Sequence, residues 1–180
     1  MKAFFLILPL LMVNACNTTK TTQVSSSEEN ETELMENSKA SCPEDGVCTL
    51  EVQRNKQIVL KKDEATAMYY PEIKDGDNMV VIYTFSKKGP EGTVDGNYSE
   101  TIHFEISPNT NELTKKGKGL QDVKLLYGKQ CYCKGEAGFY KVENGKLHVL
   151  KNNNKLEFNL QFAINKTSHK LSNISRTVQL

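Results

Sequence analysis

Two cysteines that flank a single tyrosine, Cys131 and Cys133, carry the most reactive chemistry in this chain. Two thiolates at positions i and i+2 of a strand share one face and can converge on a soft metal such as Cu(I) or Zn. Such a site needs further ligands, and no Met or His occurs within ten residues on either side. The pair also lacks the Cys-x-x-Cys spacing that lowers a thiol pKa in redox proteins. Soft-metal handling through these residues is therefore an alternative function and not the favoured one.

The start of the chain has the anatomy of a signal peptide. Lys2 supplies a positive charge, and residues 3–13 form an apolar run that contains Pro9 and is followed by the small residue Ala15. The run is eleven residues long, whereas a helix needs about 17 to 25 residues to cross a bilayer core. We therefore expect residues 1–15 to be removed and not to be retained as a membrane span.

The end of this segment, Val13-Asn14-Ala15-Cys16, resembles the lipobox of bacterial lipoproteins, and the resemblance covers residues 1–16 only. It implies that the Cys16 sulfur carries a diacylglyceryl group and that the freed amine receives another acyl chain such as palmitate. Two or more chains anchor a protein stably, at about 0.8 kcal/mol per buried CH₂. Asn17 replaces the Asp that often retains such proteins at the inner membrane. The resemblance thus implies the outer membrane of a Gram-negative bacterium, and the alternative is an ordinary secretory signal with an incidental Cys.

Cys42, Cys48, Cys131 and Cys133 form an even set once Cys16 is assigned to lipid. In the oxidising compartment that export implies, paired cysteines usually form disulfides. If Cys131 and Cys133 lie on one strand, their side chains are about 6.5 to 7 Å apart, beyond the roughly 3.5 to 4.5 Å between the Cβ atoms of a disulfide. We therefore expect two bridges that tie the first pair of cysteines to the second. The local alternative, Cys42 with Cys48, requires the second pair to lie in a turn.

No motif in the chain indicates a catalytic residue, a metal site or a cofactor. The sequence contains no Gly-x-Ser-x-Gly, no His-Glu-x-x-His and no phosphate-binding glycine loop. Residues 75–78 lack the later Glu of a calcium-binding loop and are predicted to form a turn. The histidines are scattered and are predicted to be solvent-exposed strand residues, namely His103, His148 and His169. An enzyme whose acid and base are distant in sequence stays an alternative, with candidates such as Glu44, Asp45 and His148.

Composition separates a polar linker from a mixed domain. Residues 17–40 are mainly Thr, Ser, Asn and Glu and cannot bury enough apolar surface to fold. We therefore predict that residues 16–40 are the lipidated Cys and a flexible linker. Residues 41–180 carry a net charge of +3 with interspersed signs and have the length of a single domain. Without a basic stripe, this domain is not expected to bind nucleic acid.

Alternating apolar residues predict that the domain is built from β-strands. Apolar and polar residues alternate along 156–164 and again along 101–106, the pattern of strands with one buried face. Residues 79–85 are almost all apolar, which is typical of a central strand covered on both faces. Further strands are predicted at 49–53, 57–60, 123–127 and 174–180, separated by turns at Asp75-Gly76, Asp95-Gly96 and Pro108-Asn109.

A meander of three strands is predicted around two tight turns. Asn144-Gly145 favours a two-residue hairpin between 139–143 and 146–150, because its turn type needs positive φ at both positions. A second turn at 152–155 then joins the strand at 156–164. The register keeps apolar residues opposite each other, with Val142 facing Leu147, Val149 facing Phe158 and Leu147 facing Leu160.

Together these patterns predict an all-β fold, an antiparallel β-sandwich, with a closed lipocalin-like up-and-down barrel as the alternative. We expect a membrane-anchored envelope lipoprotein that binds an envelope protein, a glycan or a small ligand, without catalysis or cofactor. A barrel would favour a carrier of a hydrophobic ligand inside it. A filled sandwich would place binding in loops such as 87–97 or 115–119.

We predict that a Cys16→Ser substitution moves the protein from the detergent-extracted membrane fraction to the soluble envelope fraction, because no acyl chain then holds it in the bilayer. The measurement is fractionation of cells followed by immunoblotting. Extraction by detergent alone, unchanged by the substitution, would contradict lipid anchoring.

Overall fold

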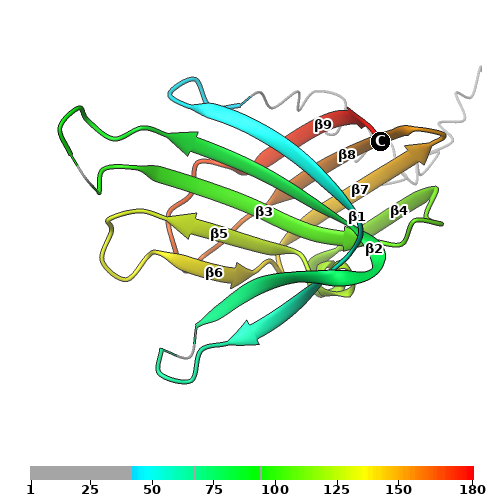
Figure 1. Cartoon of the computed structure of the whole chain (residues 1–180), viewed down its shortest axis with the longest axis horizontal. Coiled ribbons are helices and arrows are strands. Elements are labelled where there is room, and N and C mark those ends of the chain that lie inside the picture. Colours follow the sequence, from blue (N-terminus) through cyan, green and yellow to red (C-terminus); the bar gives the residue numbers. More distant parts are fainter. Residues whose placement is uncertain (1–41, 67, 94) are drawn as a thin grey trace, which may run out of the picture.

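The computed structural model describes residues 42–66, 68–93 and 95–180. The predicted signal peptide over residues 1–15, Cys16 and the predicted linker through residue 40 lie outside the described residues. The described chain forms two antiparallel sheets that pack on each other (Figure 1). The predicted β-sandwich is confirmed, because the strands divide between two sheets and do not form the one closed sheet of the barrel alternative. No helix of the described chain is long and apolar enough to cross a membrane.

One sheet has five strands in the order β1-β2-β3-β5-β6, and the other has four in the order β4-β7-β8-β9. The strands of the first sheet are β1 (Val47–Lys62), β2 (Tyr69–Lys87), β3 (Tyr98–Ile106), β5 (Leu126–Gln130) and β6 (Gly138–Lys141). Those of the second are β4 (Glu112–Lys116), β7 (Gly145–Asn152), β8 (Lys155–Phe162) and β9 (Asn173–Gln179). A 3-10 helix, η1 (Gly117–Val123), connects β4 to β5.

The main core fills the space between the two sheets. Period-two alternation turns every second residue inward, which produces rows of apolar side chains on β2, β3 and β8. The T-shaped pair of Phe104 and Phe158, with ring centroids 5.3 Å apart, joins the two inner faces. The predicted inward residues are buried in this cluster, including Ile102, Phe104, Ile106, Leu156, Phe158, Leu160, Phe162 and Ile164. Side chains of the core thus fill the space between the inner faces.

The long hairpin of β1 and β2 bends over the outer face of its own sheet. The register shifts at Lys56, which pairs with both ends of the segment 75–78. The predicted turn at Asp75-Gly76 is therefore wrong, because these residues form a bulge inside β2. Bulges bend strands, and the arm curls until Tyr69 of β2 pairs with Phe139 of β6 (Figure 1).

A buried carboxylate holds this bent arm in place. The carboxylate of Glu105, on the outer face of β3, accepts hydrogen bonds from the Ile58 backbone N–H at 2.6 Å and from Asn78 Nδ2 at 3.0 Å. It also pairs with Lys124 Nζ at 2.9 Å. A small apolar cluster lies under the arm, formed by Ile58, Val80 and Leu126. The arm thus covers part of the outer face of the first sheet, which would otherwise be exposed to solvent.

The meander is confirmed in its second half and wrong in its first. β7 and β8 pair in the predicted register, with Val149 opposite Phe158 and Leu147 opposite Leu160. β6, in contrast, pairs with β5 in the first sheet, whereas β7 pairs with β4 and β8 in the second. Asn144-Gly145 is therefore part of a crossing between sheets and not a hairpin turn.

The crossing still needs glycine, for a different reason. Gly145 has a φ of 150°, a conformation that residues with a Cβ rarely adopt. A Cβ at this position would lie 2.8 Å from the Cα of Phe162 on β8 and would contact the Gln161 carbonyl oxygen. The buried Val142, just before the crossing, enters the core. Close approach of two backbones therefore selects the residue that local turn chemistry also favours.

We predict that Gly145→Ala lowers the free energy of unfolding by more than about 2 kcal/mol, because the added Cβ meets the β8 backbone and the φ is strained. Gly92→Ala is the matched control, since Gly92 has a φ of 83° but open space around it. The control should cost only about 1 kcal/mol of backbone strain. Equal midpoints for the two variants in urea denaturation would contradict the placement of the crossing.

Candidate functional site

At one end of the sandwich the inner faces change from apolar to charged. Glu100 on β3 and Lys129 on β5 are direct cross-strand partners, and both residues are buried. Glu100 lies two residues before Ile102, so the alternation that buries Ile102 also turns Glu100 inward. A buried charge is costly unless it is paired and hydrogen-bonded. Both residues therefore depend on partners from the loops that close this end.

The carboxylate of Glu100 receives three hydrogen bonds. The backbone N–H groups of Lys170 and Leu171 donate to it at 2.6 and 2.8 Å. The Tyr98 hydroxyl, on the same strand, donates the third. Burial, followed by the hydrogen bond and charge of Glu100, raises the pKa of Tyr98 far above its ordinary value. Glu100 thereby ties the loop between β8 and β9 to β3 and holds Tyr98 protonated.

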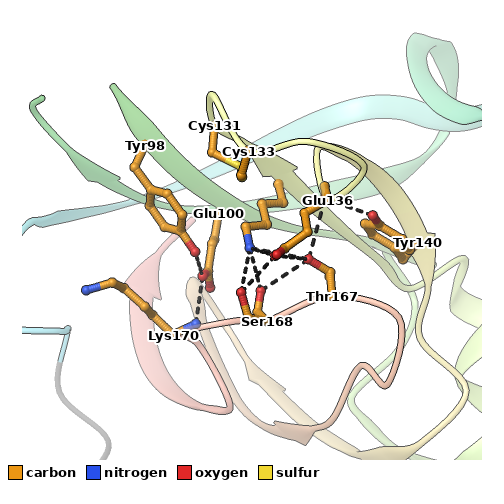
Figure 2. A network of polar contacts seen from close by, with 10 residues as sticks. Tyr98, Glu100, Cys131, Cys133, Glu136, Tyr140, Thr167, Ser168 and Lys170 are labelled. Atoms are coloured by element: carbon orange, nitrogen blue, oxygen red, sulfur yellow. Dashed lines mark hydrogen bonds and ion pairs between the residues drawn. A yellow bond between two sulfur atoms is a disulfide. The ribbon is translucent and has the colours of Figure 1, made fainter. Parts of the chain in front are cut away.

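The ammonium group of Lys129, whose side chain is 2% exposed, is the second anchor. It pairs with Glu136 at 2.5 Å and donates to the Ser168 carbonyl oxygen at 2.8 Å and to Ser168 Oγ at 2.9 Å. Thr167 Oγ1 also donates to Glu136, at 3.0 Å. These contacts, first that with Lys129 and then those with Ser168 and Thr167, lower the pKa of Glu136 to about 2. The β5–β6 connection and the β8–β9 loop are joined through this network (Figure 2).

The Cys131–Cys133 disulfide lies at the tip of the hairpin that this network supports (Figure 2). The other disulfide joins Cys42 to Cys48. The predicted bridges between the two pairs are therefore wrong, and the local alternative is confirmed. Its physical reason is that β5 ends at Gln130 and the chain then bends, which brings the Cα atoms of the second pair to 5.2 Å. As a disulfide, neither sulfur of this pair is a thiolate that could ligate a soft metal.

The Cys42–Cys48 loop places a carboxylate at the same end of the sandwich. Asp45 pairs with Lys170 Nζ at 2.5 Å and with Lys87 Nζ at 2.8 Å. The hydrogen bond to Lys170, and next that to Lys87, lower the pKa of Asp45 to about 2. This exposed cluster connects the start of β1, the end of β2 and the β8–β9 loop.

A cleft of about 690 Å³ opens beside the Cys131–Cys133 disulfide. It lies between the start of β1, the loop joining β2 to β3, and the end of β5. Two exposed apolar side chains line it, Val47 at 65% exposure and Tyr132 at 90%. These are the two most exposed large hydrophobic residues in the described part of the chain. Polar and charged groups line the remainder, among them Lys87, Lys88, Asp95, Asn97 and Gln130.

The ring of Tyr98 forms part of the same lining and is held in place by contacts with residues under the cleft. Its hydroxyl is bound to Glu100, its ring packs edge-on against Phe85 at 6.2 Å between centroids, and Lys129 Nζ lies 5.7 Å from the ring centre. Tyr132, in contrast, lies between the two bonded cysteines and is almost fully exposed at the edge of the cleft. The cleft therefore combines one rigid and one exposed tyrosine with amide and charged groups.

No hydrogen bond or ion pair among the described residues joins the proposed enzyme candidates Glu44, Asp45 and His148 to one another. Asp45 is engaged with two lysines, whereas His148 lies on the second sheet with Nδ1 2.9 Å from Thr114 Oγ1. His169 Nε2 accepts a hydrogen bond from Ile164 N at 3.2 Å, so its Nδ1–H donates to the Leu171 carbonyl at 2.8 Å. The predicted position of His169 on an exposed strand is therefore wrong, because His169 lies half-buried in the β8–β9 loop and bonds to both of its ends.

The predicted exposure of His103 is wrong, because the outer face of β3 is covered. His103 is 8% exposed and packs edge-on against Phe139, with ring centroids 5.8 Å apart. Its Nδ1 is buried without a hydrogen-bond partner among the described residues. Desolvation by burial lowers the pKa of His103 to about 4.

Sequence reasoning missed Glu100, Lys129 and Tyr98. Continuing the 102–106 alternation backwards by two residues would have placed Glu100 on the inner face. No comparable signal marked Lys129, because the strand predicted at 123–127 ends before it. The 87–97 loop, expected to carry binding in a filled sandwich, does line the cleft through Lys87, Asp95 and Asn97.

The fold and the site define an antiparallel β-sandwich with a polar and aromatic cleft at one end. No protein-family model matches this chain, and comparisons with curated proteins and with solved structures found no match.

We predict that the free energy of unfolding falls by up to about 3 kcal/mol as the pH is lowered from 6.5 to 4 through His103 alone. Its folded pKa, about 4, lies below the unfolded value of about 6.5, so the unfolded state binds more protons in this window. The stability it contributes is fully present above the window and is lost as the pH falls.

The measurement is urea denaturation at pH 7 and pH 5 for the parent protein, His103→Leu and His148→Leu. His103→Leu should lose part of the pH dependence, and His148→Leu should keep it. The same pH dependence in all three proteins would show that His103 does not titrate in this way.

Proposed function

We propose that this protein is an envelope lipoprotein, anchored through Cys16, whose β-sandwich binds a glycan in the cleft beside Tyr132. The observation that carries the proposal is the convergence of the two most exposed large hydrophobic residues, Val47 and Tyr132, on one concave surface. Exposed apolar side chains grouped in a recess indicate binding, whereas single scattered ones do not.

The chemistry of the lining favours a saccharide. A sugar ring has an apolar face of C–H groups and a rim of hydroxyls, so its site needs an aromatic surface together with directional polar groups. Tyr98 and Tyr132 supply aromatic surface with few rotatable bonds. Asn97 and Gln130 supply amide donors and acceptors, and Asp95 supplies a carboxylate.

The anchoring of the cleft favours binding without large rearrangement. Tyr98 is held by Glu100, and the β5–β6 tip is held by the Lys129–Glu136 pair. A preformed site loses less conformational entropy on binding than a mobile one. The hydrophobic-carrier alternative has less support, because side chains of the core fill the inner faces.

The test is binding of the full-length protein in detergent to two glycan probes. Purified peptidoglycan sacculi are used in co-sedimentation, and lipopolysaccharide-derived oligosaccharides are used in isothermal titration calorimetry. The two arms distinguish which envelope glycan is the source of the sugar.

We predict that Tyr132→Ala weakens binding of the recognised glycan at least tenfold, which corresponds to about 1.4 kcal/mol. Tyr70→Ala is the matched control, since Tyr70 is 46% exposed on β2 and is not part of the cleft lining. Its dissociation constant should stay within about twofold of the parent value. Failure of both probes to bind the parent protein, or equal effects of the two substitutions, would refute the glycan proposal.

A further inference from the structure

The Cys131–Cys133 bond closes a ring that the surrounding hairpin does not need in order to form. β5 and β6 pair from Leu126 with Lys141 to Lys129 with Gly138. Beyond the last pair, Lys129 binds Glu136, and the Tyr140 hydroxyl donates to the Glu136 carbonyl oxygen at 2.8 Å. The bond spans only two positions in sequence, and the stabilisation that a disulfide gives by constraining the unfolded chain is small when the closed loop is short. A disulfide at this position would therefore add little to the stability of the fold.

The position of this disulfide makes it accessible to another molecule. Cys131 lines the cleft, both cysteines are half-buried, and the intervening Tyr132 projects into solvent. In Figure 2 the pair stands at the outer edge of the polar network and not inside it. The pair therefore lies at the rim of the cleft, where the thiolate of another protein can approach it.

The Cys42–Cys48 disulfide differs from the Cys131–Cys133 bond because it lies in a loop that packs on the sandwich. Cys42–Cys48 closes the loop that carries Asp45, and Asp45 ties Lys170 and Lys87 together. Gly46 within this loop lies against the Phe85 ring and the Ser86 carbonyl oxygen. This bond orders a loop that packs on the sandwich, so its reduction should disturb the structure.

From these observations we infer that Cys131–Cys133 is a thiol–disulfide exchange site that accepts electrons from a dithiol of a partner protein. The partner's thiolate attacks Cys131 Sγ, the Cys131–Cys133 bond breaks, and Cys133 leaves as a thiolate that takes up a proton. The partner's second thiol then attacks the partner's first sulfur, which is bonded to Cys131 in the mixed disulfide. This step releases Cys131 as a second thiol. Two electrons and two protons pass to this chain, and the partner leaves with a disulfide.

Thiol–disulfide exchange needs the two sulfurs of this pair and no bound glycan. The parent protein, tested without glycan, should therefore oxidise a dithiol even if neither glycan probe binds, so that failure of either proposal can be recognised separately.

The experiment equilibrates the full-length protein in detergent with mixtures of reduced and oxidised dithiothreitol. Free thiols are then trapped with a maleimide, and each cysteine pair is quantified by mass spectrometry. We expect Cys131–Cys133 to be half-reduced at a ratio of reduced to oxidised reagent at least tenfold lower than Cys42–Cys48, which corresponds to about 30 mV. Circular dichroism should show an intact sandwich at that point.

Reduced thioredoxin, added in stoichiometric amount, is the probe for exchange with a protein dithiol. Parent protein and the Cys42→Ser/Cys48→Ser variant should both oxidise it, whereas the Cys131→Ser/Cys133→Ser variant should not. The last variant should also unfold near the parent temperature. Equal reducibility of the two bonds, unfolding on reduction of Cys131–Cys133, or unreacted thioredoxin would each overturn the inference.

Discussion

Burial of two opposite charges on the inner face of one sheet is the constraint on which this end of the molecule depends. Glu100 and Lys129 face each other across β3 and β5 at the edge of an otherwise apolar core. Leaving either group buried and unpaired would cost several kcal/mol. The β8–β9 loop and Glu136 supply the partners, so two connections far apart in sequence are drawn to the same place.

The cleft is a consequence of this closure. The polar network fixes Tyr98 from below and supports the hairpin tip that carries Tyr132, while the Asp45 cluster holds the β2 end through Lys87. Tyr98, the β5–β6 connection and the end of β2 are thus each held by a polar contact. A recess with fixed walls and an exposed aromatic ring is the arrangement that binding sites share, and a reactive disulfide at its rim adds chemistry that the core of the sandwich does not require.

Local pattern predicted those parts of the fold whose partners are close in sequence. The register of β7 and β8 followed from alternation because the connecting turn is short and one face is buried. The same reasoning failed at Asn144-Gly145, where both flanking strands were identified but belong to different sheets. It failed again at His103, whose outward position is covered by Phe139 of β6, and at Asp75-Gly76, which form a bulge that bends β2. Neither sheet assignment nor strand bending is encoded in the period of the apolar residues.

The sequence by itself determined that the chain is rich in β-strands, which residues of β3 and β8 point inward, and that four cysteines remain once Cys16 is set aside. The tertiary structure alone decided which cysteines pair, where the charges of Glu100 and Lys129 find partners, and which loops surround the cleft. The physical reason is the distance in sequence between the residues that interact. Alternation reports the environment of each side chain along one strand, whereas pairing and closure depend on where β3, β5 and the β8–β9 loop meet in space.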